Sequence, residues 1–171
     1  MSESSSTTLV VGLGTLHGGD DRVGLDVAAL IADLGLDGVE VVEQADPTNL
    51  VAMWEGRDHV VVADALLAGA EPGTVLVVEA GADAPPLDGA RMWTASGGSH
   101  AFGLADAVAL SRTLGVLPRR VTVVGVVAGS FRAMAPVSEA VRAAVPVAVD
   151  RVLAAMGTTT KNPEVSHHVS G

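Results

Sequence analysis

Cysteine is absent from this chain of 171 residues. Its absence excludes disulfide bonds, thiolate nucleophiles, zinc–thiolate sites and iron–sulfur clusters held by the chain itself. Any metal ion must therefore be held by histidine, carboxylate or backbone oxygen. Aromatic residues are also scarce, and two tryptophans are too few to form a stacking platform for bases or sugars.

Basic residues are few, with 10 Lys and Arg against 20 Asp and Glu, which gives a formal net charge of −10 and a pI near 4.7. Such an acidic chain repels phosphate backbones and anionic lipids, so we expect neither a nucleic-acid nor a membrane partner. The acidity also favours a monomer. Lys161, in the C-terminal tail, is the only lysine, which leaves no candidate for a P-loop lysine.

Long apolar runs are missing as well, because none reaches the roughly 18 residues that a membrane-spanning helix needs. Residues 1–8 have neither the basic nor the apolar region of a signal peptide, so we expect a cytoplasmic protein. The hydrophobic content of 49% is enough for one sizeable core. We expect a single domain over residues 9–156, between disordered tails at 1–8 and 157–171.

Short apolar runs alternate with segments of helical periodicity along the whole domain. The runs are continuous rather than alternating, which is typical of a mainly parallel sheet covered by helices on both faces. The predicted strands are Leu9–Leu13, Val39–Val42, His59–Asp64, Val75–Val78 and Val121–Val127, and the predicted helices are Asp21–Leu34, Asp46–Trp54, Leu104–Leu114 and a last helix opened by Pro136.

Ligand sites in such sheets lie beyond the carboxyl ends of the strands. The first strand is followed there by a glycine-rich turn that ends in Asp20 and Asp21. A dinucleotide site is excluded, because the glycine spacing is wrong and two carboxylates would repel a pyrophosphate. As a structural alternative, Asp20 could cap the following helix and Asp21 could interact with its dipole.

Two further residues stand at the same predicted edge of the sheet. Asp64 ends an apolar strand, and His100 lies where a long loop meets a helix. Each alone could be structural, and Glu43 and His17 are weaker candidates near the same edge. Together, Asp21, Asp64 and His100 would form a site of two oxygen ligands and one imidazole, with open positions for substrate or water.

Four motifs in order resemble those of the hydrogenase maturation endopeptidases, which remove the C-terminal extension from the large subunit of nickel–iron hydrogenases. They are a glycine-rich turn with an acidic pair, an apolar strand ending in Asp-Ala, a Glu-Pro-Gly-Thr turn and a His-x-x-Gly-Leu segment. In this sequence they are Gly12–Thr15 with Gly19–Asp21 and Gly24, Val60–Ala65, Glu71–Thr74, and His100–Asp106. The resemblance extends from about Leu9 to Met156.

The resemblance implies a three-layer sandwich with a five-stranded, mostly parallel sheet, in which Val75–Val78 is an antiparallel edge strand. It implies an aspartic-type, metal-dependent endopeptidase whose metal-contacting residues are Asp21, Asp64 and His100, with the general base unassigned between the two acids. The partner would be a nickel–iron hydrogenase large-subunit precursor that brings the nickel with it. In vitro, another divalent ion could occupy the site.

The sequence departs from the family pattern at two places, and the first of them, Thr15, keeps a second hypothesis open. Thr15 stands where the family usually has Asn, and Glu43–Pro47 replaces a glycine-rich segment that is thought to help read the substrate. The alternative is a non-proteolytic accessory factor of the same fold, which binds a metal or a partner during hydrogenase maturation.

Overall fold

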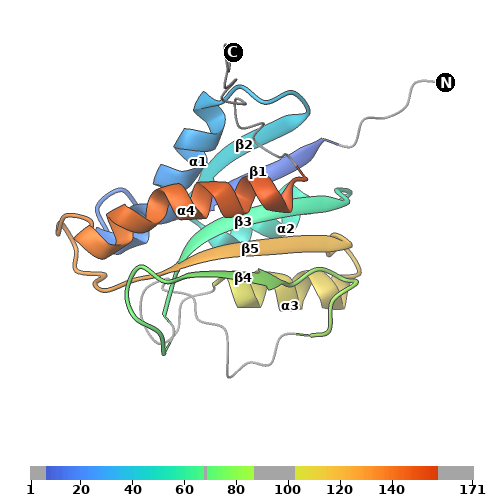
Figure 1. Cartoon of the computed structure of the whole chain (residues 1–171). Coiled ribbons are helices and arrows are strands. Elements are labelled where there is room, and N and C mark those ends of the chain that lie inside the picture. Colours follow the sequence, from blue (N-terminus) through green and yellow to red (C-terminus); the bar gives the residue numbers. More distant parts are fainter. Residues whose placement is uncertain (1–6, 68, 87–102, 158–171) are drawn as a thin grey trace, which may run out of the picture.

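The computed structural model describes residues 7–67, 69–86 and 103–157 (Figure 1). Five strands form one sheet in the order β2-β1-β3-β5-β4, in which β4 runs antiparallel to β5 and the other neighbours are parallel. The strands are β1 (Thr8–Leu13), β2 (Val39–Gln44), β3 (His59–Leu66), β4 (Val75–Glu79) and β5 (Arg120–Val127). The predicted sheet and its antiparallel edge strand are confirmed.

Helices cover both faces of the sheet, as predicted. One face packs against α1 (Val23–Asp33) and α4 (Glu139–Ala155), and the other against α2 (Leu50–Trp54) and α3 (Leu104–Leu114). Side chains alternate between the two cores, so that in β1 Val10 faces α1 and α4 while Val11 faces α2 and α3. No helix in the described part of the chain is both long enough and apolar enough to cross a membrane.

Trp54 belongs to the core between the sheet, α2 and α3. Its side chain is 0% exposed, and its indole Nε1–H donates to the Ser111 hydroxyl on α3 at 2.9 Å. This satisfies the buried polar atoms of both residues. Trp54 is therefore a core residue that joins two helices.

Helix starts agree with the sequence in some places and differ in others. The predicted cap at Asp46 is confirmed, because its Oδ1 accepts from Thr48 N at 2.9 Å and Pro47 begins the turn. α1 begins at Val23 rather than Asp21, because residues 19–22 form a separate 3₁₀ turn, η1 (Gly19–Arg22). α4 begins at Glu139 rather than Pro136, because the chain stays extended through Ser138.

Gly24 allows α1 to approach the sheet at backbone distance. A Cβ atom there would overlap the carbonyl oxygen of Leu13 in β1 and lie 2.5 Å from that of Ala63 in β3. Only glycine leaves room for both carbonyls. The close approach sets the position of η1, which precedes Gly24 and carries Asp20 and Asp21.

We expect Gly24→Ala to destabilise the fold by about 1–3 kcal/mol or more, because overpacking against rigid backbone outweighs the roughly 1 kcal/mol gain in helix propensity. The melting temperature should fall by about 2–4 °C per kcal/mol. Gly69→Ala is the matched control, since a Cβ at Gly69 meets nothing within 4 Å. Equal melting temperatures for the two variants would contradict the close approach.

Candidate active site

Two carboxyl groups meet at the carboxyl edge of the central strands. Asp64 lies two residues before the end of β3, and Asp21 lies in η1, directly after the neighbouring strand β1. The side chain of Asp64 alternates with Ala63 and therefore belongs to the same sheet face as Val62, towards α2 and α3. This edge is where ligands bind in open α/β sheets.

Asp64 is a buried acid with half of its carboxyl group unpaired. The residue is 2% exposed, and its Oδ1 accepts from the backbone N–H of Ala65 at 2.8 Å. Its Oδ2 is buried and accepts from no donor in the described part of the chain. Burial raises the pKa of Asp64 well above its usual value, the negative charge of Asp21 raises it further, and the bond from Ala65 offsets only part of this.

Asp21 is the more accessible of the two acids. Burial raises its pKa, and hydrogen bonds from Thr15 counteract part of that rise. The Thr15 hydroxyl donates to Asp21 Oδ2 at 2.8 Å. Thr15, one of the two departures from the family pattern, therefore holds the carboxylate of a predicted site residue, a contact that the sequence did not reveal.

Asp20 has a different role from the predicted helix cap. Neither η1 nor α1 has a side-chain cap. Instead, the Asp20 carboxylate accepts from Gly129 N at 2.7 Å, Ser130 N at 3.0 Å, Ser138 N at 2.7 Å and Ser138 Oγ at 2.9 Å. These donors lie 109 to 118 residues away along the chain, so local sequence patterns cannot reveal them. Because Ser138 points its N–H and hydroxyl at Asp20, α4 begins only after it.

The remaining candidates are not all brought to this site. His100 lies outside the described residues, and residues 7–67, 69–86 and 103–157 contain no group of three side chains arranged to hold a metal ion. His17 is exposed, and its carbonyl accepts from Met134 N at 2.8 Å. Glu43 is exposed at the end of β2.

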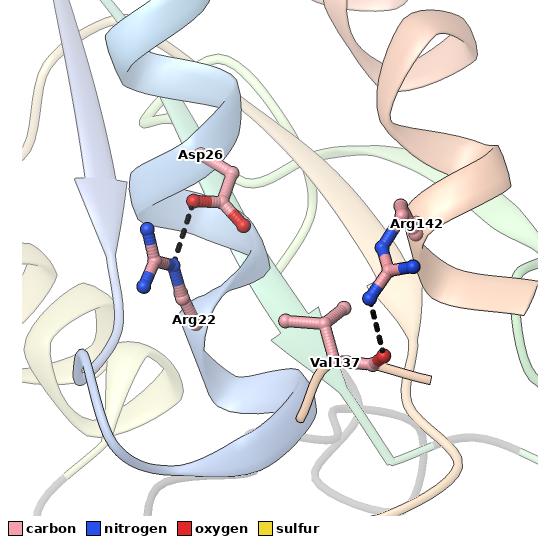
Figure 2. Close-up of polar contacts among 4 residues, drawn as sticks. All are labelled: Arg22, Asp26, Val137 and Arg142. Carbon is pink, nitrogen blue, oxygen red and sulfur yellow. Dashed lines mark hydrogen bonds and ion pairs between the residues drawn. The ribbon is translucent and has the colours of Figure 1, made fainter. Parts of the chain in front are cut away.

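Two hollows flank the loop that carries Asp21. One, of about 310 Å³, is bordered by Thr15, Leu16 and Glu43. The other, of about 340 Å³, is bordered by Leu16 and Arg22 on one side and by Val137 and Arg142 on the other. Figure 2 shows both sides of the second hollow: Arg22 donates to Asp26 at 2.9 Å, and Arg142 donates to the carbonyl of Val137 at 3.3 Å. Leu16, 57% exposed, borders both hollows.

The acid pair has the chemistry of a hydrolytic site. Burial raises the pKa values of both carboxyl groups, and a carboxyl group with a raised pKa is suited to general acid–base catalysis. The same oxygens are suitable ligands for a divalent cation.

Comparison with known proteins identifies the family to which this α/β domain belongs. A family model described as hydrogenase maturation protease, HycI, matches residues 30–155. The chain belongs to the hydrogenase maturation protease family, and it is a peptidase. This confirms the resemblance seen in the sequence.

Individual relatives agree with the family match. The hydrogenase 2 maturation protease of Escherichia coli K12 is 28% identical over 152 residues, which cover 86% of this chain and 89% of that protein. The solved structure of the E. coli hydrogenase maturating endopeptidase HybD is 25% identical, covers 88% and 91% of the two chains and superposes with a TM-score of 0.67. A hydrogenase 2 maturation peptidase from a Thaumarchaeota archaeon is 29% identical, with 89% and 99% coverage and a TM-score of 0.62.

We expect Asp64→Asn to stabilise the fold. A raised folded-state pKa means that ionised Asp64 lowers stability, with the full penalty above the folded pKa and none below the unfolded value near 3.8. The neutral amide keeps an acceptor for Ala65 N–H and removes the buried charge. Denaturant titrations should show a gain that is large at about pH 8 and shrinks as the pH falls. A gain that grows towards acid pH would contradict this account.

Proposed function

We propose that this peptidase removes the C-terminal extension of a nickel–iron hydrogenase large-subunit precursor after nickel insertion, acting as a cytoplasmic monomer. It recognises the nickel that the precursor carries through Asp21, Asp64 and His100. The observation that carries the proposal is the unpaired Oδ2 of Asp64, buried and under the electrostatic influence of Asp21.

An unpaired carboxylate oxygen in the core costs stability unless a donor or a cation compensates it. Two neighbouring carboxylates make this cost larger, because each disfavours ionisation of the other. A cation supplied by the substrate would compensate both groups at once. Two carboxylates and one imidazole form a weak nickel site by themselves, which suits a protease that must test whether the precursor already holds nickel.

His100 is the proposed third ligand, and the topology supports its reach. The short connection after α3 leads into β5, which starts at the edge opposite the carboxyl ends. The first residue of α3, Leu104, therefore lies at the edge that carries Asp64. The chain between His100 and Gly103 can span at most about 10 Å. The helix end that His100 precedes in the sequence therefore lies at the edge of the acids, which supports the proposal that His100 is the third ligand.

The difference between the two acids suggests how the proton moves. Asp64, the more deeply buried, is the group that holds a proton most firmly in the free protein. Nickel brought by the precursor would favour the ionised form, so the proton leaves as the complex assembles. The bound nickel would polarise the scissile carbonyl or activate water, and one of the two aspartates would accept a proton from the attacking water.

The surface around the acids supports a protein substrate. The exposed side chain of Leu16 lies between two hollows and five residues from Asp21. Exposed apolar side chains beside a cleft are typical of protein interaction sites.

The Thr15–Asp21 hydrogen bond weakens the basis of the accessory-factor hypothesis. Although Thr15 departs from the family pattern, its hydroxyl still donates to the acid.

The decisive test is intact-mass analysis of a nickel-loaded precursor incubated with the wild-type protein or with Asp21→Ala. We expect the wild type to release one discrete C-terminal peptide from the loaded precursor, because the site needs the cation that the precursor supplies. Asp21→Ala should reduce the rate by at least about 100-fold, as expected when an essential metal ligand or base is lost.

A nickel-free precursor is the matched substrate control, and we expect it to stay intact. Cleavage of both precursors at equal rates would refute the recognition of nickel. A stable complex with no change in mass would instead favour the accessory factor.

The hydroxyl of Thr15 is expected to contribute to cleavage through its hydrogen bond to Asp21. Thr15→Val keeps the shape of the side chain but removes the hydroxyl that donates to Asp21. Loss of a hydrogen bond to a charged group, about 1.5 kcal/mol at an exposed position, should lower kcat/KM by about tenfold. Thr15→Ser keeps the hydroxyl and should retain most of the activity. Equal rates for the two variants would show that the bond contributes nothing to cleavage.

A further inference from the structure

We propose that Asp20 is a positioning residue for Asp21. Its carboxylate fixes the turn η1 to the connection between β5 and α4, and thereby keeps Asp21 beside Asp64. We call this cluster of four residues the Asp20 joint; its members are Asp20, Gly129, Ser130 and Ser138. The inference deepens the proposed function, on which its nickel-dependent part rests.

The joint is fully formed in the free protein. Asp20 is 0% exposed, and its two carboxylate oxygens accept from three backbone N–H groups and one hydroxyl at 2.7–3.0 Å. Burial alone would raise the pKa of Asp20, but the hydrogen bonds from Ser138, Gly129 and Ser130 together lower it. Asp20 thus remains an anion held by donors from within the chain, unlike Asp64.

Backbone contacts join the same two segments on both sides of the carboxylate. Asp20 N donates to Ser130 O at 2.9 Å, and Met134 N donates to His17 O at 2.8 Å. Gly19 has φ +60°, and a Cβ there would lie 3.0 Å from Ser130 O. The turn before Asp21 is therefore fitted closely against the residues that follow β5, and β5 itself pairs with the strand of Asp64.

This arrangement gives the joint a function beyond packing. Asp21 is the next residue after Asp20, and within the described part of the chain its own side chain is held by Thr15 alone. Asp21 and Asp64 come from separate segments of the chain, and their carboxylates repel when both are ionised, so the surrounding structure must keep them close. The joint supplies that constraint, because it ties η1 to the sheet through β5. Without it, Asp21 could move away from Asp64.

The test compares Asp20→Asn with Ser138→Ala in the full-length protein. Asp20→Asn removes the anion and turns an amide towards N–H donors, whereas Ser138→Ala removes one of the four bonds. We measure kcat for the nickel-loaded precursor, and the dissociation constants for loaded and nickel-free precursors by calorimetry. A displacement of about 1 Å at a reacting group can cost about 100-fold. We expect Asp20→Asn to lose about 10- to 100-fold in kcat and most of its preference for the loaded precursor, with a smaller loss in the same direction for Ser138→Ala.

Two controls separate positioning from general instability. Val141→Ala makes a cavity in the core of α4, near the joint, and should keep the preference for the loaded precursor. Asp83→Asn removes an exposed acid from its ion pair with Arg119, which lines neither hollow, and should leave kcat and the preference unchanged.

The proposal is overturned if Asp20→Asn and Ser138→Ala keep the wild-type kcat and preference, or if Val141→Ala loses as much of both. Should Asp20→Asn fail to fold, Ser138→Ala decides the outcome. A wild-type protein that binds and cleaves both precursors alike would refute nickel recognition only. The kcat values of the variants would then still decide whether Asp20 positions Asp21.

Discussion

An acid buried in the central strand of a parallel sheet is the constraint around which this protein is built. β3 lies between β1 and β5, and each residue from Val60 to Leu66 is buried. In the part of the chain that the structure describes, one oxygen of Asp64 has no hydrogen-bond partner. The apolar packing on both faces of the sheet must offset the free energy that is lost by burying this carboxyl group. Family membership identifies the protein as a peptidase, and the proposed function assigns this acid to its catalytic site.

Asp21, the second acid, must be held near Asp64 by the surrounding structure. Asp21 lies close enough to Asp64 to raise its pKa, so the two carboxylates repel one another when both are ionised. Thr15 holds Asp21 from the side of β1, and Asp20 anchors the same turn to the β5–α4 connection. Gly24 lets α1 lie against the strands at backbone distance, and this close approach sets the position of η1, the turn before Gly24. Polar contacts and close backbone packing together maintain an arrangement that electrostatics opposes.

Much of this fold follows from local patterns in the sequence. Continuous Val-rich runs predict a buried parallel sheet, and the helix at Leu104–Leu114 and the cap at Asp46 follow from periodicity and turn chemistry. Asp64 and Asp21 are found because strand ends in α/β folds share one edge. The role of Asp20 could not be found in this way, since its partners are more than 100 residues away. The start of α4 depends on the same long-range bonds. His100 stays a prediction.

The contrast between Asp20 and Asp64 distinguishes a structural carboxylate from a functional one. Each is buried and lies near the carboxyl edge, but Asp20 accepts four hydrogen bonds and has a lowered pKa, while Asp64 accepts one and has a strongly raised pKa. A satisfied anion gains little from an added cation, whereas an unsatisfied acid gains much, because the cation replaces the missing donors. Under the proposed mechanism, this unmet interaction couples proteolysis to the metal. In that mechanism only a precursor that carries nickel would complete the site, and the protein would need no tightly bound metal of its own.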